Sequence, residues 1–280
     1  MLWRCRDRVF DLTDRTLLMG IVNVTPDSFS DPGRTFEPSA AVARARQMVG
    51  EGADLIDLGA ESTRPGSAPV PAGQQIRRLK PVLEALSDAP VCLSIDSSSA
   101  EVAEMALGLG ARVVNDVTAL GDPAMAGVVK GAGAGVVLLH MLGTPATMQH
   151  DPRYDDVTTE VQTWLADRLA TAKAAGIEPD SIAIDPGIGF GKLARHSLEL
   201  IARLDRIVTL GRPVLIGISR KSFLGGPLDL PVDERLEAGL AATAIAVYHG
   251  ARIVRTHDVT ATRRAVCTGA AIRAARASAS

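Results

Sequence analysis

The sequence predicts a single α/β domain folded as a (β/α)8 TIM barrel. Eight apolar runs of strand length alternate with segments of helical pattern, and no change of composition divides the 280 residues. Because 46% of the residues are hydrophobic but only 3% are aromatic, the core must be aliphatic, as it is around buried parallel strands. A doubly wound sheet is the alternative, but eight regular strand–helix units favour the closed barrel.

The strands are expected at the apolar runs and the helices at the segments between them. The expected strands are 17–24, 55–60, 91–96, 113–117, 135–140, 182–185, 213–219 and 253–257. The expected helices are 40–50, 74–86, 100–109, 123–131, 157–175, 196–210, 234–250 and 260–274. The core of the barrel should therefore span about residues 17–274, with a short N-terminal extension before it and a frayed tail after it.

Capping and turn residues set the boundaries of these elements. Ser39 and Ser99 can cap the helices that follow them, and Gly176 stops the fifth helix. Segments 26–34 and 61–72 are rich in Pro, Ser and Gly, so they form long loops rather than helices.

The bulk composition narrows the function. A net charge of −2 gives no reason to expect binding to nucleic acid or to a membrane surface. Residues 1–15 are charged throughout, unlike a signal peptide, and no apolar run reaches the ~18 residues that a membrane span needs. Cys5, Cys92 and Cys267 have neither metal-site spacing nor an even-numbered disulfide framework. We therefore expect a soluble, cytoplasmic enzyme.

A polar side chain ends or follows nearly every predicted strand. These residues are Asn23, Glu61, Thr63, Asp96, Asn115, His140, Asp185, Lys221, Arg255 and His257. In a TIM barrel the carboxyl ends of the strands meet at one mouth, where active sites lie. Buried carboxylates and amides are unfavourable without partners, so a polar ligand is the natural partner for this set.

The mouth divides into two kinds of chemistry. The first group, Asp96, Asn115, Asp185 and Lys221, offers donors and acceptors suited to a flat heterocycle with amide and amino edges. The second group combines Asn23 from the first strand with two residues of the last strand, which is its neighbour in a closed barrel. An arginine, a histidine and an amide oxygen suit a phosphate group with its metal ion.

Eight motifs taken together identify a family. In chain order they are VNVTPDSFSD, ESTRPG, SID, ND, HMLGTPATMQ, DPGIGFGK, SRKSFLG and RTHDV. With them, roughly residues 17–265 resemble the dihydropteroate synthase family of folate biosynthesis. The resemblance implies condensation of 7,8-dihydropterin-6-ylmethyl diphosphate with 4-aminobenzoate, with release of diphosphate. It also implies a Mg²⁺ cofactor, no nucleic-acid or membrane partner, and a homodimer.

The resemblance also implies a role for each residue that matches a family motif. Asp96, Asn115, Asp185 and Lys221 match the pterin-holding positions, Asn23 the magnesium ligand, Arg255 and His257 the diphosphate contacts, and Thr63 and Phe190 further substrate contacts. Phe29, Arg64, Pro65 and Ser222 match the aminobenzoate pocket. The residues taken as catalytic are Asp185, Lys221, Arg255 and His257. The implied reaction fits ionisation at the pterin methylene before attack by the weakly nucleophilic amine.

Several neighbouring polar residues have a structural interpretation instead. Glu61 should brace the second loop, Asp116 should be a structural neighbour of Asn115, and Arg220 should form a surface contact or salt bridge. His140 should line or support the mouth, and Lys192 is only a secondary candidate. We also expect His150, His196 and His249 on the surface.

Two other functions remain possible from the sequence alone. One is a pterin-dependent methyltransferase, against which the intact TPDSFSD and STRPG loops argue. The other is a non-catalytic pterin-binding paralogue, which should have lost Asn23, Arg255 or His257. Segment 61–66 has the ordinary form of the second loop, so we expect sensitivity to sulfonamides.

Overall fold

Eight parallel strands form one sheet that closes into a barrel in the computed structural model, which describes residues 1–25, 38–62, 66–225 and 230–277. The strands are β3 (Leu17–Asn23), β4 (Leu55–Gly59), β5 (Cys92–Asp96), β6 (Val113–Asp116), β7 (Gly135–Leu139), β8 (Ile182–Asp185), β9 (Leu215–Gly217) and β10 (Ile253–Thr256). They pair in the order β8-β7-β6-β5-β4-β3-β10-β9. A parallel bridge between Ile184 and Val214 joins the two ends, so the predicted TIM barrel is confirmed.

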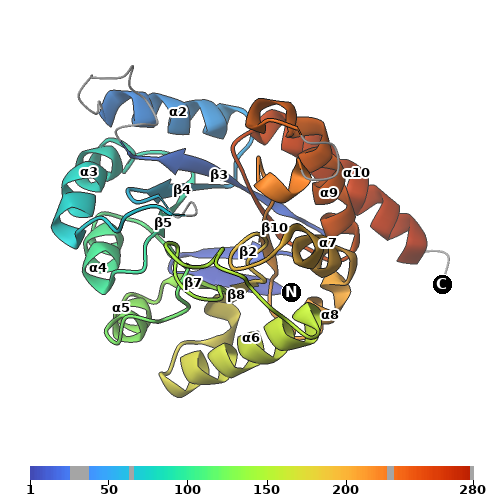
Figure 1. Cartoon of the computed structure of the whole chain (residues 1–280). Helices are drawn as coiled ribbons and strands as arrows, with labels where there is room; N and C mark the ends of the chain where they lie inside the picture. Colours follow the sequence, from blue (N-terminus) through green and yellow to red (C-terminus); the bar gives the residue numbers. More distant parts are fainter. Residues whose placement is uncertain (26–37, 63–65, 226–229, 278–280) are drawn as a thin grey trace.

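Helices surround the sheet (Figure 1). They are α2 (Pro38–Gly50), α3 (Ala72–Ala85), α4 (Ala100–Gly108), α5 (Met125–Ala132), α6 (Val157–Ala174), α7 (Ala194–Ala202), α8 (Leu204–Val208), α9 (Leu236–Tyr248) and α10 (Val259–Ala277). Ser99 caps α4 as predicted, but Ser39 lies inside α2, which begins at Pro38. The helix predicted at 196–210 is two helices, because the chain leaves helical geometry at Arg203. No described helix is long and apolar enough to cross a membrane.

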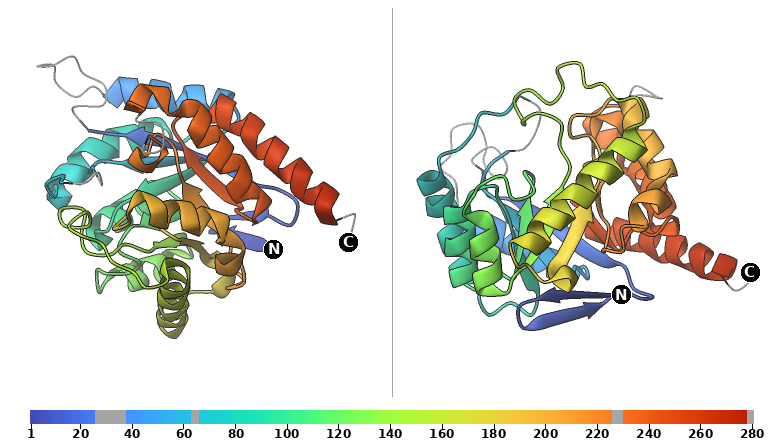
Figure 2. Two further views of the ribbon diagram at one scale, coloured as in Figure 1. Left: turned by 45° about the vertical axis from the view of Figure 1, so that its right-hand side comes forward. Right: turned by 90° about the horizontal axis from the view of Figure 1, so that it is seen from below.

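The N-terminal extension is part of the core, which the sequence analysis did not predict. It forms an antiparallel hairpin of β1 (Leu2–Cys5) and β2 (Arg8–Asp11). Trp3, Cys5 and Leu12 are fully buried, and the indole nitrogen of Trp3 donates to the backbone oxygen of Ser181 at 3.1 Å. Figure 2 shows the hairpin at one end of the barrel, and these side chains close that end.

Side chains inside the barrel change from apolar to polar along each strand. Residues of a strand alternate between the inside and the helices, so every second residue faces inward. The inward residues nearest the hairpin form one apolar cluster with Trp3, Cys5 and Leu12. Its strand members are Leu17, Met19, Leu55, Cys92, Val113, Val137, Ala183, Leu215 and Ile253. Two residues further on, most of these strands place a polar group or a glycine inside, and the site begins there.

Candidate active site

The strand register brings the predicted residues of β3, β5 and β6 to one level. Asn23 pairs with Gly59 of β4, Gly59 pairs with Asp96, and Asp96 pairs with Asn115. Gly59 lies beside Asp96 at this level, where a Cβ atom would come into van der Waals contact with the Asp96 side chain at 3.4 Å. Closure of the sheet therefore gathers residues that are far apart in the chain.

Asp57 lies at the centre of a buried polar layer that also contains Ser94, Asp96, Asn115 and Arg255, and it is not among the residues predicted for the site. Its carboxylate is fully buried and accepts hydrogen bonds from Ser94 Oγ at 2.6 Å and Asn115 Nδ2 at 2.9 Å. Arg255 Nε donates to the same carboxylate at 2.6 Å. The signal was present, since Asp57 is the one charged residue within an otherwise apolar run, but its partners lie on other strands.

Arg255 links Asp57 to Asp96. The guanidinium donates through Nε to Asp57 and through an η nitrogen to Asp96 at 2.7 Å. The sequence predicted Arg255 on the phosphate-binding side of the mouth, whereas its described contacts are with the carboxylates of Asp57 and Asp96. Its proposed contact with a diphosphate stays a prediction.

Burial alters the acidity of these carboxyl groups. It raises the pKa of Asp96 to about 7, with the nearby Asp57 adding to the shift and Arg255 opposing it. Burial also raises the pKa of Asp185, against the opposing charge of Lys221. A ligand that donates hydrogen bonds or carries positive charge would stabilise the ionised form of both groups.

Asn115 has an unused acceptor. Its side-chain nitrogen is held by Asp57, but its buried Oδ1 has no hydrogen-bond partner within the described part of the chain. A buried polar atom without a partner is costly unless a ligand or water satisfies it. An N–H group of a bound ring could donate the missing hydrogen bond to Asn115 Oδ1.

The loop after β8 is shaped by Asp185 and glycine. The Asp185 carboxylate accepts from the backbone N–H of Gly187 at 2.7 Å. Gly187 has φ of +68°, and a Cβ atom there would lie 1.8 Å from the backbone oxygen of His140. Only glycine fits this close approach, so the loop can fold tightly over the strand end.

Lys221 lies against the same loop. Its ammonium donates to the backbone oxygen of Ile188, and it lies 4.5 Å from the ring centroid of Phe190. Burial lowers the pKa of Lys221 to about 8, although the charge of Asp185 opposes that shift. Asp185, Phe190 and Lys221, each a predicted substrate contact, therefore share one wall of the site.

A buried layer behind this wall is built around Lys192. Its ammonium lies 2.9 Å from His140 Nδ1 and donates to the backbone oxygen of Phe190 at 2.9 Å. Burial lowers the pKa of Lys192 to about 7 and the pKa of His140 to about 3, so the imidazole is neutral. His140 therefore supports the mouth, as predicted, and Lys192 holds the backbone that carries Phe190.

His196 was expected on the surface, and that expectation was wrong. The side chain is 4% exposed, and its Nδ1 accepts from the backbone N–H of Leu193 at the start of α7. Its ring packs edge-on against Tyr154, with 5.1 Å between centroids. The burial depends on segment 141–156 folding back over α7, which local sequence does not reveal.

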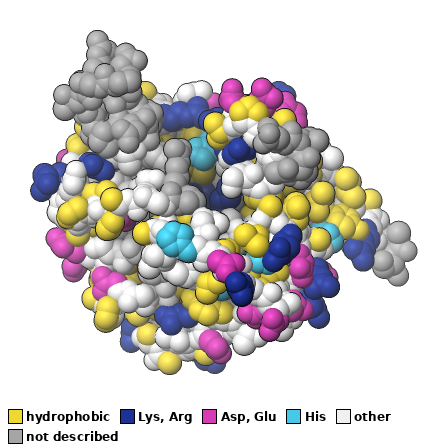
Figure 3. All heavy atoms as spheres, in the orientation of Figure 1, with side chains coloured by type: hydrophobic (Ala, Val, Ile, Leu, Met, Phe, Trp, Pro, Cys, Tyr) yellow, Lys and Arg dark blue, Asp and Glu magenta, His cyan; other side chains and the backbone are white. Residues whose placement is uncertain are grey.

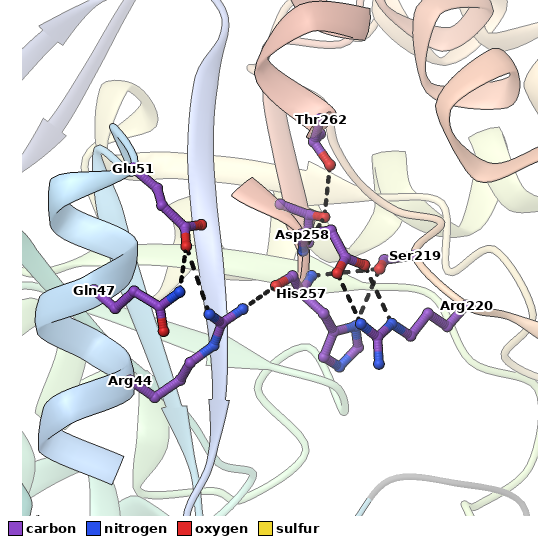
Figure 4. Close-up of polar contacts among 9 residues, drawn as sticks. Arg44, Gln47, Glu51, Ser219, Arg220, His257, Asp258 and Thr262 are labelled. Carbon is purple, nitrogen blue, oxygen red and sulfur yellow. Dashed lines mark hydrogen bonds and ion pairs between the residues drawn. The ribbon is translucent and has the colours of Figure 1, made fainter. Parts of the chain in front are cut away.

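His257 directly follows β10, which pairs with β9. Its Nδ1 lies 3.1 Å from Ser219 Oγ, and Arg44 of α2 donates to its backbone oxygen at 2.6 Å (Figure 4). Arg220 pairs with Asp258, as its predicted salt-bridge role requires. In the space-filling view, basic and histidine side chains meet near the middle of this face (Figure 3).

The remaining predictions have mixed outcomes. Glu61 braces the second loop by accepting from the backbone N–H of Val70 at 2.8 Å, as expected. Asp116 is structural, since it accepts from Thr118 and from the backbone of Leu120. Ser222 is exposed at the start of a short 3-10 helix. The predicted residues Phe29, Thr63, Arg64 and Pro65 lie outside the described residues.

The described residues offer few metal ligands. Asn23 is partly buried at the end of β3. No group of three or more His, Cys, Asp or Glu side chains in the described ranges could hold a metal ion. A magnesium ion that is held mainly by substrate phosphates and water needs only one or two protein ligands. The single amide of Asn23 fits such an ion.

Fold and site together define a barrel enzyme with a buried layer of hydrogen-bonding side chains at the carboxyl ends of its strands. The model of the family described as "Pterin binding enzyme" matches residues 19–257. The dihydropteroate synthase of Escherichia coli K12 is 42% identical over 250 residues, which cover 89% of each chain. This chain belongs to the pterin-binding enzyme family.

Solved structures agree. The dihydropteroate synthase of Yersinia pestis, in complex with a sulfonamide drug, superposes with a TM-score of 0.91 at 40% identity over 98% of this chain and 100% of that one. The Xanthomonas albilineans enzyme in complex with 7,8-dihydropteroate gives a TM-score of 0.87 at 38% identity, over 98% and 99% of the two chains.

Proposed function

We propose that this protein is a dihydropteroate synthase of folate biosynthesis. It joins 7,8-dihydropterin-6-ylmethyl diphosphate to 4-aminobenzoate and releases diphosphate. The observation that carries the proposal is the buried layer of Asp57, Asp96, Asn115 and Arg255 beside Asp185 and Lys221, in a family whose similar structures include one with the reaction product.

The two sides of a pterin ring suit the two sides of the pocket. Asp185 can accept from the amino and N–H groups of the ring edge, while Lys221 can donate to a ring oxygen or nitrogen. Asn115 offers its unpaired Oδ1 to a further N–H. The carboxylates of Asp96 and Asp185 also stabilise the positive charge that spreads into the pterin ring when the bond from the methylene carbon to oxygen breaks.

The leaving diphosphate takes the electron pair of that bond. His257 and Arg255 supply donors to its oxygens in this proposal, and Asn23 with the diphosphate would hold Mg²⁺. The ion supplies charge neutralisation for the leaving group. The aminobenzoate nitrogen then forms the new bond to the methylene carbon, and its proton passes to solvent or diphosphate. A strong general base is unnecessary because the electrophile is already cationic.

The aminobenzoate pocket is assigned by family resemblance to Phe29, Arg64, Pro65 and Ser222. We accordingly propose that sulfonamides inhibit this protein by occupying that pocket, since the similar Yersinia pestis structure is a complex with a sulfonamide drug. Complementation of a bacterium lacking its own enzyme tests this: growth should be sulfonamide-sensitive, and strong resistance would contradict the proposal.

A direct assay tests the reaction itself. Purified protein is incubated with the pterin diphosphate, 4-aminobenzoate and Mg²⁺, and the mixture is analysed for dihydropteroate and diphosphate in equal amounts. Omission of Mg²⁺ or addition of a chelator should abolish turnover. A pterin-dependent methyltransferase or a non-catalytic paralogue would bind pterin but form no dihydropteroate, and that result would overturn the proposal.

We also propose a cytoplasmic homodimer. All three cysteines are free thiols, which suits a reducing compartment. Exposed apolar residues lie on three neighbouring helices: Leu198 on α7, Ile245 on α9 and Ile272 on α10, each between 45% and 54% exposed. Hydrophobic side chains gather over α9 and α10 in Figure 3. Light scattering would distinguish a dimer from the 29.3 kDa monomer.

A further inference from the structure

The side-chain hydroxyl of Ser219 lies close to two nitrogen atoms of His257, one in the ring and one in the backbone. Its hydroxyl oxygen is 3.1 Å from the ring atom Nδ1 and 3.3 Å from the backbone nitrogen of His257 (Figure 4). These two atoms are the only hydrogen-bond partners of the Ser219 side chain within the described part of the chain. One hydroxyl therefore serves a single histidine.

The donor and acceptor count sets the direction of the backbone bond and favours one direction for the bond to the ring. The backbone N–H of His257 can only donate, so Ser219 Oγ accepts it. The hydroxyl proton of Ser219 then needs an acceptor, and Nδ1 is the one within reach. If Nδ1 carried the proton instead, both bonds would point at Oγ and the hydroxyl proton would be left without a described partner.

We propose that Ser219 is a positioning residue that holds the neutral His257 ring in the tautomer with its proton on Nε2. Side chains alternate along β10, with Arg255 facing into the barrel and Thr256 facing out to bond Thr262 of α10 at 2.8 Å. His257, two residues after Arg255, is partly buried just beyond the end of β10. Its Nε2–H is then a donor for an anion oxygen. This inference rests on the proposed function only for naming that anion as diphosphate.

Ser219 is itself held by a strained turn. Arg220 has φ of +62°, which is unfavourable for a residue with a side chain. The bidentate pair between its guanidinium and Asp258, with N–O distances of 2.7 and 3.2 Å, maintains the turn. Arg235 also donates to the Arg220 backbone oxygen at 3.4 Å. Because Asp258 directly follows His257, the same ion pair ties the serine loop to the histidine.

The other side of His257 is fixed from α2. Arg44 donates to its backbone oxygen at 2.6 Å and pairs with Glu51 further along the helix, at 3.6 Å. Gln47 donates to the same Glu51 at 2.7 Å, so the arginine is oriented before it reaches β10 (Figure 4). Arg44 thus holds the backbone of His257, and Ser219 contacts its ring.

The tautomer can be read without substrate. Long-range ¹H–¹⁵N spectra distinguish which imidazole nitrogen is protonated, and loss of signals in His257→Gln assigns this ring among the five histidines. Above the pH at which the ring is charged, wild type should show the Nε2–H form alone. Ser219→Ala should give a mixture of forms and Ser219→Thr should restore one. A wild-type Nδ1–H pattern, or an unchanged pattern in Ser219→Ala, would overturn the proposal.

Binding of inorganic diphosphate gives a second readout. We expect Ser219→Ala to raise the dissociation constant of Mg²⁺–diphosphate and the KM for the pterin diphosphate about tenfold, as for a weakened hydrogen bond to a charged group. The KM for the aminobenzoate substrate should not change, and Ser219→Thr should bind like wild type. The matched control is Ser87→Ala, an exposed serine whose hydroxyl bonds the Glu84 backbone.

The outcomes separate the inference from the proposed function. Should dihydropteroate never form while the tautomer depends on Ser219, the function is wrong and the positioning role stands. Should turnover be normal and the tautomer indifferent to Ser219→Ala, the positioning role is wrong and the function stands. If Ser219→Ala does not fold, the wild-type spectrum and Ser219→Thr still decide the tautomer.

Discussion

On β4, Leu55 faces the apolar lower half of the barrel interior, and Asp57, two residues further on, faces the polar upper half. The same step occurs on four other strands. It runs from Cys92 to Ser94 and Asp96, from Val113 to Asn115, from Ala183 to Asp185, and from Ile253 to Arg255. One set of strands thus carries two interiors of opposite chemistry.

This contrast explains how the protein tolerates its active site. Buried carboxylates and an ammonium are unfavourable for folding, and even well-paired ion pairs seldom offset their desolvation. The lower interior is a dry cluster sealed by the hairpin, and burial of such side chains contributes ~1.5–3 kcal/mol each. The lower end stabilises the barrel, and the upper end uses part of that stability to preorganise charge.

The largest expected effect is on the free energy of unfolding, when the hairpin loses a side chain that closes the lower end of the barrel. Trp3→Ala removes a fully buried ring from the lower cluster together with its hydrogen bond to Ser181. We expect the free energy of unfolding to fall by about 3–5 kcal/mol, measured by urea denaturation. The kcat at 25 °C should stay near the wild-type value, because the ring lies at the end of the barrel opposite the polar layer.

The control for Trp3→Ala is Phe10→Ala. Phe10 packs on Trp3 with 6.1 Å between ring centroids, but it is only partly buried, so its loss should be milder. Equal destabilisation by the two variants, or loss of kcat in folded Trp3→Ala, would show that the two ends of the barrel are not separable.

A substitution in the polar upper half of the barrel should have the opposite effect, reducing activity without reducing stability. Asp185→Asn keeps the shape of the side chain but removes the charge that faces Lys221, so kcat/KM should fall about 10²–10³-fold. Stability should be equal or higher, because burial raises the pKa of this carboxyl and thus opposes its charged form. Activity assays and thermal unfolding of one preparation test both parts. Near-normal turnover would remove Asp185 from the chemistry.

The sequence predicted the upper interior better than the lower one. Strand-end residues such as Asp96, Asn115 and Asp185 follow apolar runs, and parallel topology alone brings them together. The hairpin of β1 and β2 was not predicted, because its two four-residue strands are short and mostly exposed. Their burial at Trp3 and Cys5 depends on a closed barrel end, which exists only after all eight strands are paired.

Within the site, the missing information was also long-range. Asp57 and Arg255 are 198 residues apart, and nothing local indicates that they form an ion pair. The orientation of Arg255 towards Asp57 and Asp96 follows from the register of β10 on β3 and of β3 on β4. Residue types at strand ends were predictable, but the partner that each side chain selects was not.

Activity should fall at both low and high pH, because the site contains one acid and one base with shifted pKa values. With the pKa of Asp96 at about 7 and that of Lys221 at about 8, the ionised pair coexists only in a narrow range. Below pH 7 Asp96 gains a proton, and above pH 8 Lys221 loses one. The kcat/KM for the pterin diphosphate should therefore be bell-shaped, falling up to tenfold per pH unit outside that range.

Lys221→Arg sharpens this prediction. A guanidinium stays protonated, so the alkaline limb should shift upward while the acid limb remains where Asp96 places it. A flat wild-type profile between pH 6 and 9, or an alkaline limb unmoved by the substitution, would detach these two groups from the rate.

The smallest expected effect is on how the free energy of unfolding depends on pH, through the buried Lys192. In the folded protein the pKa of Lys192 is about 7, against an ordinary value of 10.5. Between these values the unfolded chain binds a proton that the folded chain does not, so Lys192 makes stability rise with pH, by at most about 1.4 kcal/mol per unit. Lys192→Met removes this contribution, and denaturant titrations from pH 7 to 9.5 should give a shallower slope.

Lys173→Met is the matched control, since the exposed Lys173 on α6 is solvated in both states and should leave the slope at the wild-type value. The difference between wild type and Lys192→Met isolates one ammonium, because Lys221 contributes to both. If the two slopes coincide, Lys192 is charged at pH 7 to 9.5 in the folded state. The layer behind Phe190 would then resemble the charged upper interior rather than the neutral support that its contacts with His140 describe.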